Sequence, residues 1–353
     1  MKLFAHDEVQ AFVQRVHPGL RKTRWTNLCW VIFGLLRCGR PSLSPIARCI
    51  RGPRRLIHRI KRMARFIDNP RLPQRQLAAQ LTWFNWAMGA RQPKPRVLMD
   101  YTDLGHGQIS LWTALAYRGR SVPLLCQVLP KQCDEGSRNR CEHQMILELK
   151  ALLGRHFVLI ADRGFARASL FEMLNEHDID FVIRIDDHSM IHMTEGRSLA
   201  GHIALGRKRR LYLGRVAYHS QRRVPLHLVI CRRHGGRWNL ASSLDDERLI
   251  QQMYASRMQI EEMFRDLKQH LGIERMRCTT TARHQTWLLL CAIAYSYLYW
   301  LGLLAQRAGL SGQYHYWKSE SVFWLGLQIV RCADRRLTKL NQRLLGRLLN
   351  RSG

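Results

Sequence analysis

The sequence predicts an α/β protein with a mixed β-sheet core, a β-rich insertion and a helical N-terminal region. Three observations support this fold class. Up to about residue 90, apolar side chains recur at helical spacing. From residue 97, short apolar runs separated by glycine-containing turns indicate strands. Residues 186–245 then add further strand-like runs before a helical pattern returns. A chain of 353 residues can bury a sizeable core in two or three structural units.

Residues 1–92 are predicted to form a helical DNA-binding region. One helix starts at Ser44, the chain breaks at Gly52, and a second helix resumes with apolar residues at helical spacing. The polar face of this second helix carries Arg55, Arg59, Lys61 and Arg62. A helix, a turn and a basic helix indicate a helix-turn-helix in which Arg55 and Arg59 contact DNA. The alternative is a small bundle whose polar face happens to be basic.

Residues 93–185 are predicted to form the first part of the core, after a proline-containing linker. Three consecutive strand-like runs indicate antiparallel strands, and a helix, a strand, a helix and a strand follow them. The order is therefore βββαβαβ. The expected strands cover 97–104, 109–117, 121–129, 157–162 and 180–185, and the expected helices cover 142–153 and 166–176.

The remaining segments are an insertion, the rest of the core and a tail. Residues 186–245 contain the runs "RLYLGRVAY", "VPLHLVI" and "WNLAS", which predict a β-rich insertion. Residues 246–310 are expected to return to the core as two helices. Residues 311–353 form a basic amphipathic pattern, so we expect a basic helical C-terminal tail.

One segment raises the alternative of a membrane protein. Residues 287–305 contain no charged side chain and meet the length criterion for a membrane span. The segment is the only one of its kind and includes three tyrosines, a serine and a glycine. We therefore expect a central buried helix and no membrane contact.

Composition indicates a nucleic-acid partner and a reducing compartment. The chain has 57 Lys and Arg against 26 Asp and Glu, a formal net charge of +31, and these cations are spread along its length. So large an excess favours an extended contact with a polyanion.

The ten cysteines have no regular pairing and no signal peptide is apparent, which predicts free thiols in a cytoplasmic protein. Zinc binding by Cys133, Cys141 and His143 is disfavoured because their spacing is not C-x2-C-like.

Two aspartates are expected to meet at one edge of the sheet. Asp100 ends the apolar half of the first strand, and Asp162 ends the fourth. In a βββαβαβ sheet these strands are neighbours, so the two side chains can share one end. Asp103 competes with Asp100 but faces the other side of its strand, because side chains alternate with a period of two. A turn role for Asp162 remains open at this point.

The stretch "YASRMQIEEMFRDLKQHLG", residues 254–272, is predicted to be one helix. Its apolar residues gather into one arc, and Glu261 lies at the edge of that arc on a stripe with Tyr254, Arg257 and Lys268. Glu262 and Asp266 lie opposite the arc, and we expect both to be solvated. For Glu261 the alternatives are an ion pair with Arg257 or Arg265 and a functional acid facing a cleft.

Three carboxylates in one place would hold protons unless cations neutralised them. An oxygen-only set of Asp100, Asp162 and Glu261 would favour two Mg²⁺ or Mn²⁺ ions. Two such ions about 4 Å apart suit an in-line phosphoryl displacement. With a polyanion-binding surface, this indicates phosphodiester chemistry.

The motifs also resemble a known family. "MDYT" at 99–102, "ADRGF" at 161–165 and the spacing Tyr254-x2-Arg257-x3-Glu261-x6-Lys268 are similar to the DDE transposases of bacterial insertion sequences, in the cut-and-paste group with the Y-R-E-K signature. The resemblance covers about residues 25–310. The segment "KRMARFIDNP" is similar to the N-terminal DNA-binding region of this family.

The resemblance implies a ribonuclease H-like core in which Asp100, Asp162 and Glu261 bind two Mg²⁺ (or Mn²⁺) ions. It further implies that Tyr254, Arg257 and Lys268 contact phosphates of the element end. The expected partners are double-stranded DNA, both element ends and target, and a second copy of the chain in a synaptic complex. The expected location is the nucleoid.

Trp238 in the insertion is a candidate platform for stacking an unpaired base, and a plain core role is the alternative.

Two other functions stay open for the whole chain. One is a transposase-derived DNA-binding protein without catalysis, and the other is a different two-metal nuclease on the same fold.

Overall fold

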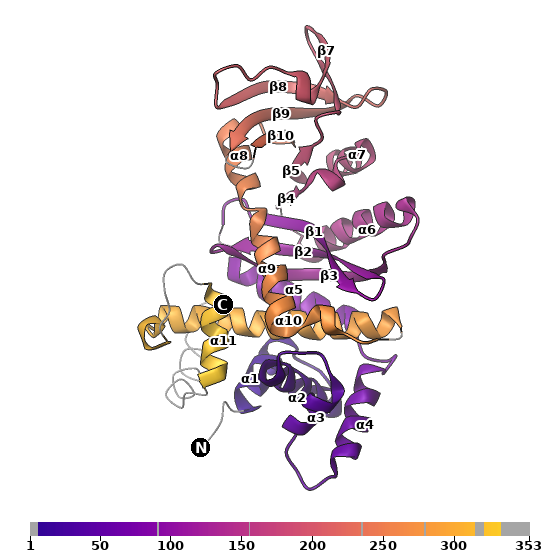
Figure 1. Cartoon of the computed structure of the whole chain (residues 1–353), viewed down its shortest axis with the longest axis vertical. Helices are drawn as coiled ribbons and strands as arrows, with labels where there is room; N and C mark the ends of the chain where they lie inside the picture. Colours follow the sequence, from indigo (N-terminus) through magenta and orange to yellow (C-terminus); the bar gives the residue numbers. More distant parts are fainter. Residues whose placement is uncertain are drawn as a thin grey trace.

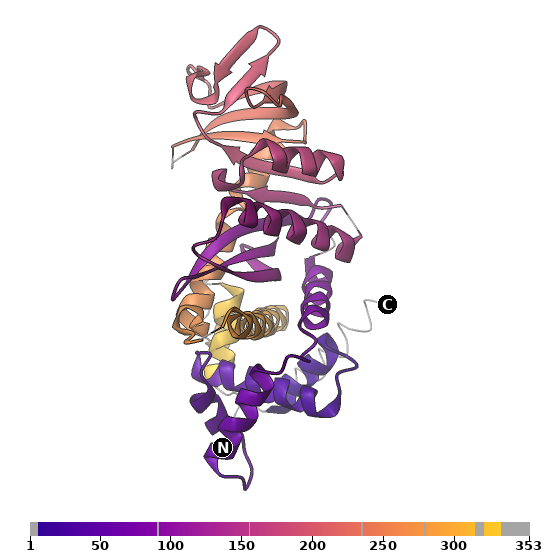
Figure 2. The ribbon, with the colours of Figure 1, turned by 90° about the vertical axis from the view of Figure 1, so that its right-hand side faces the viewer.

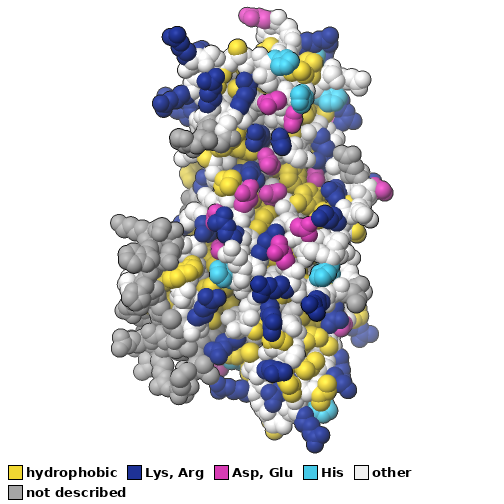
Figure 3. Space-filling model, in the orientation of Figure 1, with side chains coloured by type: hydrophobic (Ala, Val, Ile, Leu, Met, Phe, Trp, Pro, Cys, Tyr) yellow, Lys and Arg dark blue, Asp and Glu magenta, His cyan; other side chains and the backbone are white. Residues whose placement is uncertain are grey.

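The computed structural model describes residues 6–89, 92–154, 156–233, 236–278, 280–314 and 321–332. The molecule is elongated, with the strands of the insertion at one end and helices α1 to α4 at the other (Figure 1). Figure 2, a quarter turn away, shows helix α10 end-on between the central sheet and the N-terminal helices. Lys and Arg side chains are spread over the face seen in Figure 3 from one end to the other, as expected from the sequence.

Helices and strands are distributed much as the sequence predicts. The strands are β1 (Arg96–Gly105), β2 (Gln108–Tyr117), β3 (Arg120–Pro130), β4 (Val158–Ala161), β5 (Asp180–Ile185), β6 (Met190–Met193), β7 (Gly196–Leu199), β8 (Arg210–Tyr218), β9 (Val224–Arg233) and β10 (Gly236–Ser242). The α-helices are α1 (His6–Val16), α2 (Lys22–Cys38), α3 (Leu43–Cys49), α4 (Leu56–Ile67), α5 (Gln74–Gly89), α6 (Glu135–Leu153), α7 (Ala168–Glu176), α8 (Glu247–Ala255), α9 (Met258–Leu271), α10 (Thr281–Arg307) and α11 (Val322–Cys332).

All ten described strands form one mixed sheet in the order β3-β2-β1-β4-β5-β10-β9-β8-β6-β7. β1, β2 and β3 are antiparallel, whereas β4 runs parallel to both β1 and β5. The five core strands and the adjacency of the first and fourth are therefore confirmed.

The insertion is β-rich, as predicted, but it is not a separate sheet. Its last strand, β10, pairs antiparallel with β5, with Ser242 opposite Val182, so the insertion extends the core sheet. The sequence pattern missed β6 and β7, which have only four residues each. Segments this short leave too few positions for an alternating pattern to be recognised.

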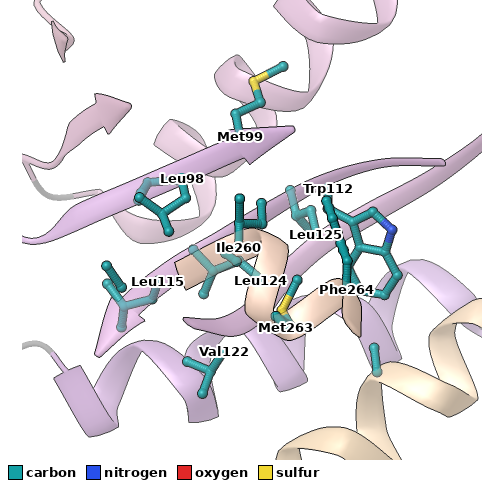
Figure 4. Close-up of a cluster of buried hydrophobic side chains, with 14 of the residues drawn as sticks. Leu98, Met99, Trp112, Leu115, Val122, Leu124, Leu125, Ile260, Met263 and Phe264 are labelled. Atoms are coloured by element: carbon teal, nitrogen blue, oxygen red, sulfur yellow. The ribbon is translucent and has the colours of Figure 1, made fainter. Parts of the chain in front are cut away.

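Helix α9 covers one face of the β1–β3 part of the sheet. In Figure 4 its side chains Ile260 and Met263 project towards Leu98 of β1 and its neighbours, while Met99 projects from the opposite face. Because side chains alternate along a strand, Asp100 emerges on the same face as Leu98. The packing of α9 thus brings its polar edge to Asp100.

The apolar segment at 287–305 is a buried core helix, as predicted. Among the described residues, α10 is the one helix long and apolar enough to cross a membrane, and its most apolar window is 100% buried inside the protein. Its polar side chains bond to neighbouring backbone. The Tyr295 hydroxyl donates to the Ser121 carbonyl (3.1 Å) and the Tyr299 hydroxyl donates to the Tyr117 carbonyl (2.6 Å). The tyrosines therefore anchor α10 to the ends of β2 and β3.

Helix α11 corrects the predicted C-terminal tail where the structure describes it. Of residues 311–353, it describes 311–314 and 321–332, and α11 is a buried apolar helix rather than a basic one. It crosses α10 at two glycines. A Cβ at Gly302 would lie 1.9 Å from the Val322 carbonyl oxygen, so the two backbones are in direct contact. The rest of the predicted tail lies outside the described residues.

The helix, turn and basic helix of the N-terminal region are confirmed as α3, the turn at 50–55 and α4. Arg59 has a structural role that the sequence did not reveal, because its guanidinium donates to the carbonyl oxygens of Ile50, Gly52 and Arg54 and so braces the turn. Arg55 is exposed. The cysteines whose side chains the structure describes are free thiols, as predicted.

Candidate functional site

Asp100 and Asp162 lie at the same edge of the sheet. The parallel pairing of β1 and β4 ends with Met99 opposite Ala161, and each aspartate is the next residue of its chain segment. Asp162 caps the short 3-10 helix that follows it, and its Oδ1 accepts a hydrogen bond from the Arg163 N–H (2.8 Å). Asp162 therefore does have the turn role considered above, and it still presents the rest of its carboxylate to the site.

The stretch at 254–272 is two helices, so the prediction of one continuous helix was wrong. α8 ends at Ala255 and α9 begins at Met258. At the break, the buried Ser256 hydroxyl donates to the Met253 carbonyl (2.6 Å), a local bond that competes with helical pairing. The break turns Arg257 towards the edge of the sheet.

Arg257 joins the three acids. Its Nη1 lies 3.4 Å from Asp100 Oδ2 and 4.0 Å from Asp162 Oδ2, and its Nη2 forms an ion pair with Glu261. The sequence offered an ion pair and a catalytic cluster as alternatives for Glu261, and the structure contains both features at once. We call Asp100, Asp162, Glu261 and Arg257 the acidic cluster. In Figure 3, acidic side chains gather on this face near the junction of α8 and α9.

The acidic cluster has an excess of negative charge. Burial raises the pKa of Asp100 to about 6, and the neighbouring carboxylates of Asp162 and Glu261 act in the same direction while Arg257 opposes them. Burial alone would lower the pKa of Arg257, but the charges of Asp162 and Glu261 outweigh it and raise the value. The single Arg257 guanidinium therefore neutralises three carboxylates only in part, and the remaining negative charge would attract a further cation.

Tyr254 supports Asp162 from the end of α8. Its buried hydroxyl donates to Asp162 Oδ1 (3.1 Å), and burial together with the Asp162 charge raises the pKa of Tyr254, which keeps it a donor. Its ring forms an edge-type contact with Trp238 of β10, with centroids 5.0 Å apart and planes at 73°. Trp238 is half-buried and lies at the margin of the acidic cluster, so the insertion contributes to this site.

Asp266 is buried, contrary to the prediction, and Glu262 is only partly exposed. Arg120 of β3 lies 3.3 Å from Glu262 and 3.4 Å from Asp266, and Arg265 pairs with Glu262 at 2.9 Å. Asp266 is 7% exposed, and burial raises its pKa to about 6. The helical pattern could not reveal this, because Arg120 approaches from a strand far away in the sequence.

Two other charged residues lie apart from the acidic cluster. Lys268 pairs with Glu274 (2.6 Å), beyond the C-terminal half of α9. Asp103 pairs with Lys131 (2.7 Å) and is 45% exposed, whereas 22% of the Asp100 side chain is exposed. The structure therefore brings Asp100 rather than Asp103 to Asp162, as the strand periodicity indicated.

The donor chemistry of the acidic cluster fits a hard divalent cation, because all donors are carboxylate oxygens. Among the residues that the structure describes, no three His, Cys, Asp or Glu side chains are close enough to hold an ion as they stand. The Arg257 guanidinium lies among the three acids. A bound cation would compensate the same carboxylates that Arg257 now compensates.

A second basic feature surrounds the predicted helix-turn-helix. A cleft of ≈ 970 Å³ lies between α2, the turn at 50–55 and α4. Seven cationic or titratable side chains besides Arg59 line it: Arg24, Arg51, Arg54, His58, Lys61, Arg62 and Arg65. Arg59 also lines this cleft and holds the turn, whereas Arg55 lies outside its lining.

Comparison with protein families identifies a match for the chain. A family described as "Transposase DDE domain" matches residues 105–297, more than half of the chain, so the chain belongs to this family. Asp162 and Glu261 lie within the matched segment, and Asp100 lies five residues before it. The mixed α/β sheet fits the ribonuclease H-like core that the resemblance implied. No curated protein matches the chain.

Proposed function

We propose that this DDE transposase mobilises a bacterial insertion sequence of the Y-R-E-K group. It would bind the two ends of the element as double-stranded DNA, cleave them by metal-dependent hydrolysis and join the 3′ ends to target DNA. A homodimer in a synaptic complex, working at the nucleoid, would hold both ends. The observation that carries the proposal is the meeting of Asp100, Asp162 and Glu261, from three separate elements, around Arg257.

Asp100, Asp162 and Glu261 would hold two Mg²⁺ or Mn²⁺ ions. Such ions supply an activated water and stabilise the leaving oxygen of a phosphodiester. Asp100 is the most buried of the three, since 22% of its side chain is exposed against 40% for Glu261. Its carboxylate would therefore form the fixed side of the site. Glu261 lies on the more open side, where DNA would approach.

Tyr254 and Arg257 position the reacting groups. The Tyr254 hydroxyl holds Asp162 Oδ1, which restricts the rotation of that carboxylate. Arg257 is half-buried and already carries its charge beside the acids. When cations neutralise the acids, the Arg257 guanidinium can donate to a phosphate of the bound strand, for which its planar fork is well suited.

Three further residues would contact DNA away from the acids. Trp238 would stack on a base displaced at the cleaved end, an interaction that contributes roughly 1–3 kcal/mol. Lys268 would neutralise a phosphate farther along α9. Arg55, exposed at the start of α4, would contact DNA directly, while Arg59 would act by holding the turn.

The test uses the full-length protein, Mg²⁺ and labelled DNA that carries the flanking element ends. We expect strand cleavage at the ends and joining of the new 3′ ends to a target plasmid. The matched control is Asp162→Asn, which keeps an oxygen to accept from Tyr254 and should bind ends without cleaving them. Cleavage by this folded variant would contradict the assignment of the acids.

The two alternative functions give different outcomes in the same assay. A transposase-derived DNA-binding protein would bind the ends and leave them uncut in the presence of Mg²⁺ or Mn²⁺. A different two-metal nuclease would cut the DNA but would not join its 3′ ends to a target. Either outcome would replace the proposed function.

A further inference from the structure

Four exposed arginines line a second groove, which lies between the N-terminal region and the catalytic core. Its volume is ≈ 1080 Å³. One wall consists of α3 with Ile60 of α4, and the other consists of the turn between β1 and β2 and the segment at 274–287. The exposed arginines are Arg40, Arg48, Arg275 and Arg277, and the half-buried Arg283 lines the groove beside them.

These arginines lack acidic partners in the described part of the chain. Arg283 pairs with Asp68 (3.4 Å), and Glu274, the one acidic residue in the lining, pairs with Lys268 (2.6 Å). None of the ion pairs among the described residues involves the four exposed guanidinium groups. Like charges that converge on a groove repel one another, and this repulsion is relieved when an anion binds between them.

We propose that this groove binds the phosphate backbone of duplex DNA between the helix-turn-helix and the acidic cluster. The inference rests on the proposed function for the identity of the DNA, and it adds a site at the junction of two regions. Arg48 from one wall and Arg275 and Arg277 from the other would contact phosphates of the same duplex. Bound DNA would thereby fix the N-terminal region relative to the core.

The distance between the groove and the acidic cluster indicates which phosphates of the duplex the groove would contact. Lys268 lies seven residues after Glu261 in α9, which is about 10 Å along a helix. His106, which lines the groove, lies in the turn six residues after Asp100, a distance of at most about 20 Å. A duplex rises 3.4 Å per base pair. The groove would therefore contact phosphates about six base pairs from the cleaved bond, with Lys268 between the two places.

Duplex DNA suits the groove better than an acidic protein segment does. The groove and the basic cleft described above are both lined by residues of α4, so two basic surfaces adjoin within the N-terminal region. A regularly spaced polyanion can follow such a path, and arginine forks match the geometry of phosphate groups.

The test measures DNA affinity against salt concentration without divalent cations, so that it does not depend on cleavage. Full-length protein binds a fluorescent 40-base-pair random duplex, and the slope of log K against log salt is recorded. Arg275→Gln/Arg277→Gln should reduce the magnitude of this slope by about 1.8, because each lost phosphate contact contributes about 0.9. Adding Arg48→Gln should reduce it by a further 0.9 or so.

The matched control is Arg15→Gln/Arg21→Gln, which removes two exposed arginines that line neither the groove nor the basic cleft. It should leave the slope unchanged, and all variants should melt at the wild-type temperature. A slope equal to that of wild type in the Arg275→Gln/Arg277→Gln variant would overturn the proposal, whatever the cleavage result. Conversely, a chain that shows the expected slopes but never cuts element ends would contradict the proposed function and leave the groove in place.

A second experiment identifies the phosphates of the DNA that contact the groove. Ethylation of phosphates about six base pairs from the cleaved bond should interfere with wild-type binding to an element end. The same ethylation should have little effect on Arg275→Gln/Arg277→Gln. Equal interference in both proteins would place the contact elsewhere.

Discussion

Helix α9 contributes to two clusters of carboxylates, one built around Arg257 at its own N-terminus and the other around Arg120 of β3. The acidic cluster gathers Asp100, Asp162 and Glu261 around Arg257. The second cluster gathers Glu262 and Asp266 around Arg120. Adjacent residues in the sequence, Glu261 and Glu262, thus belong to different environments.

The two clusters differ in charge balance and in access to solvent. Around Arg120, Arg265 adds a second cation at 2.9 Å from Glu262, so two acids face two guanidinium groups. Around Arg257, three acids share one. The side chain of Asp266 is 10% exposed, whereas those of Asp162 and Glu261 are 35% and 40% exposed. A balanced, closed cluster stabilises the fold, whereas an unbalanced, open one can take up a cation and a substrate.

The largest expected difference between the clusters is in catalysis. Asp162→Asn and Glu261→Gln should each reduce strand cleavage by at least a thousandfold while binding of element ends persists, because each would remove a ligand of the proposed ions. Glu262→Gln should retain cleavage within a few fold. A gel assay of end cleavage by the three folded variants measures this. An inactive Glu262→Gln beside an active Glu261→Gln would reverse the assignment of the two clusters.

The two arginines should differ in what they support. Arg257→Ala should slow cleavage at saturating DNA and Mg²⁺ by on the order of a hundredfold, the scale of a displacement of about 1 Å at the reacting centre. Arg120→Ala should instead lower the free energy of unfolding by roughly 1–3 kcal/mol, since Asp266 is left buried without its partner. Single-turnover rates and urea denaturation separate the two effects. Matching rates for Arg257→Ala and wild type would make Arg257 a purely structural ion-pair partner.

Metal binding should distinguish the clusters without any reaction. Mn²⁺ at ten times its dissociation constant should stabilise the wild-type protein by about 1.4 kcal/mol, measured as a rise in melting temperature. Asp162→Asn should lose this stabilisation, and Asp266→Asn should keep it. A metal-dependent rise that is equal in both variants would place the ions outside the acidic cluster.

The smallest expected effect concerns pH. The pKa of Asp266 in the folded protein is about 6, above the unfolded value near 4, so its contribution to the free energy of unfolding is full below pH 4 and is lost as the pH rises to 6. Asp266→Asn should remove this dependence and stabilise the protein at pH 8 by at most roughly 3 kcal/mol. Urea denaturation between pH 4 and 8 measures it.

Asp103→Asn is the control for the pH effect, because its hydrogen bond from Lys131 lowers the pKa of Asp103 and so gives the opposite sign. Removing Asp103 should make the protein less stable at pH 8 relative to low pH. If the free energy of unfolding of Asp266→Asn varied with pH as that of the wild-type protein does, burial of Asp266 would have no energetic consequence.

The sequence by itself determined the order of the core elements and the candidates for the acidic cluster. Short apolar runs located β1 to β5, and the side-chain period of two selected Asp100 over Asp103. Local patterns suffice for such features because each strand or helix repeats its own period along the chain. The resemblance of the motifs then agreed with the family match over residues 105–297.

Only the tertiary structure decided which charges meet. Arg120 reaches Glu262 and Asp266 from β3, and the break at Ser256 directs Arg257 to acids on two strands, although each pairing joins distant parts of the sequence. The continuation of the insertion into the core sheet and the arginine groove between α3 and the segment at 274–287 likewise depend on how elements dock. A helical projection describes one element in isolation, whereas burial and charge pairing at its surface are set by the neighbours packed against it.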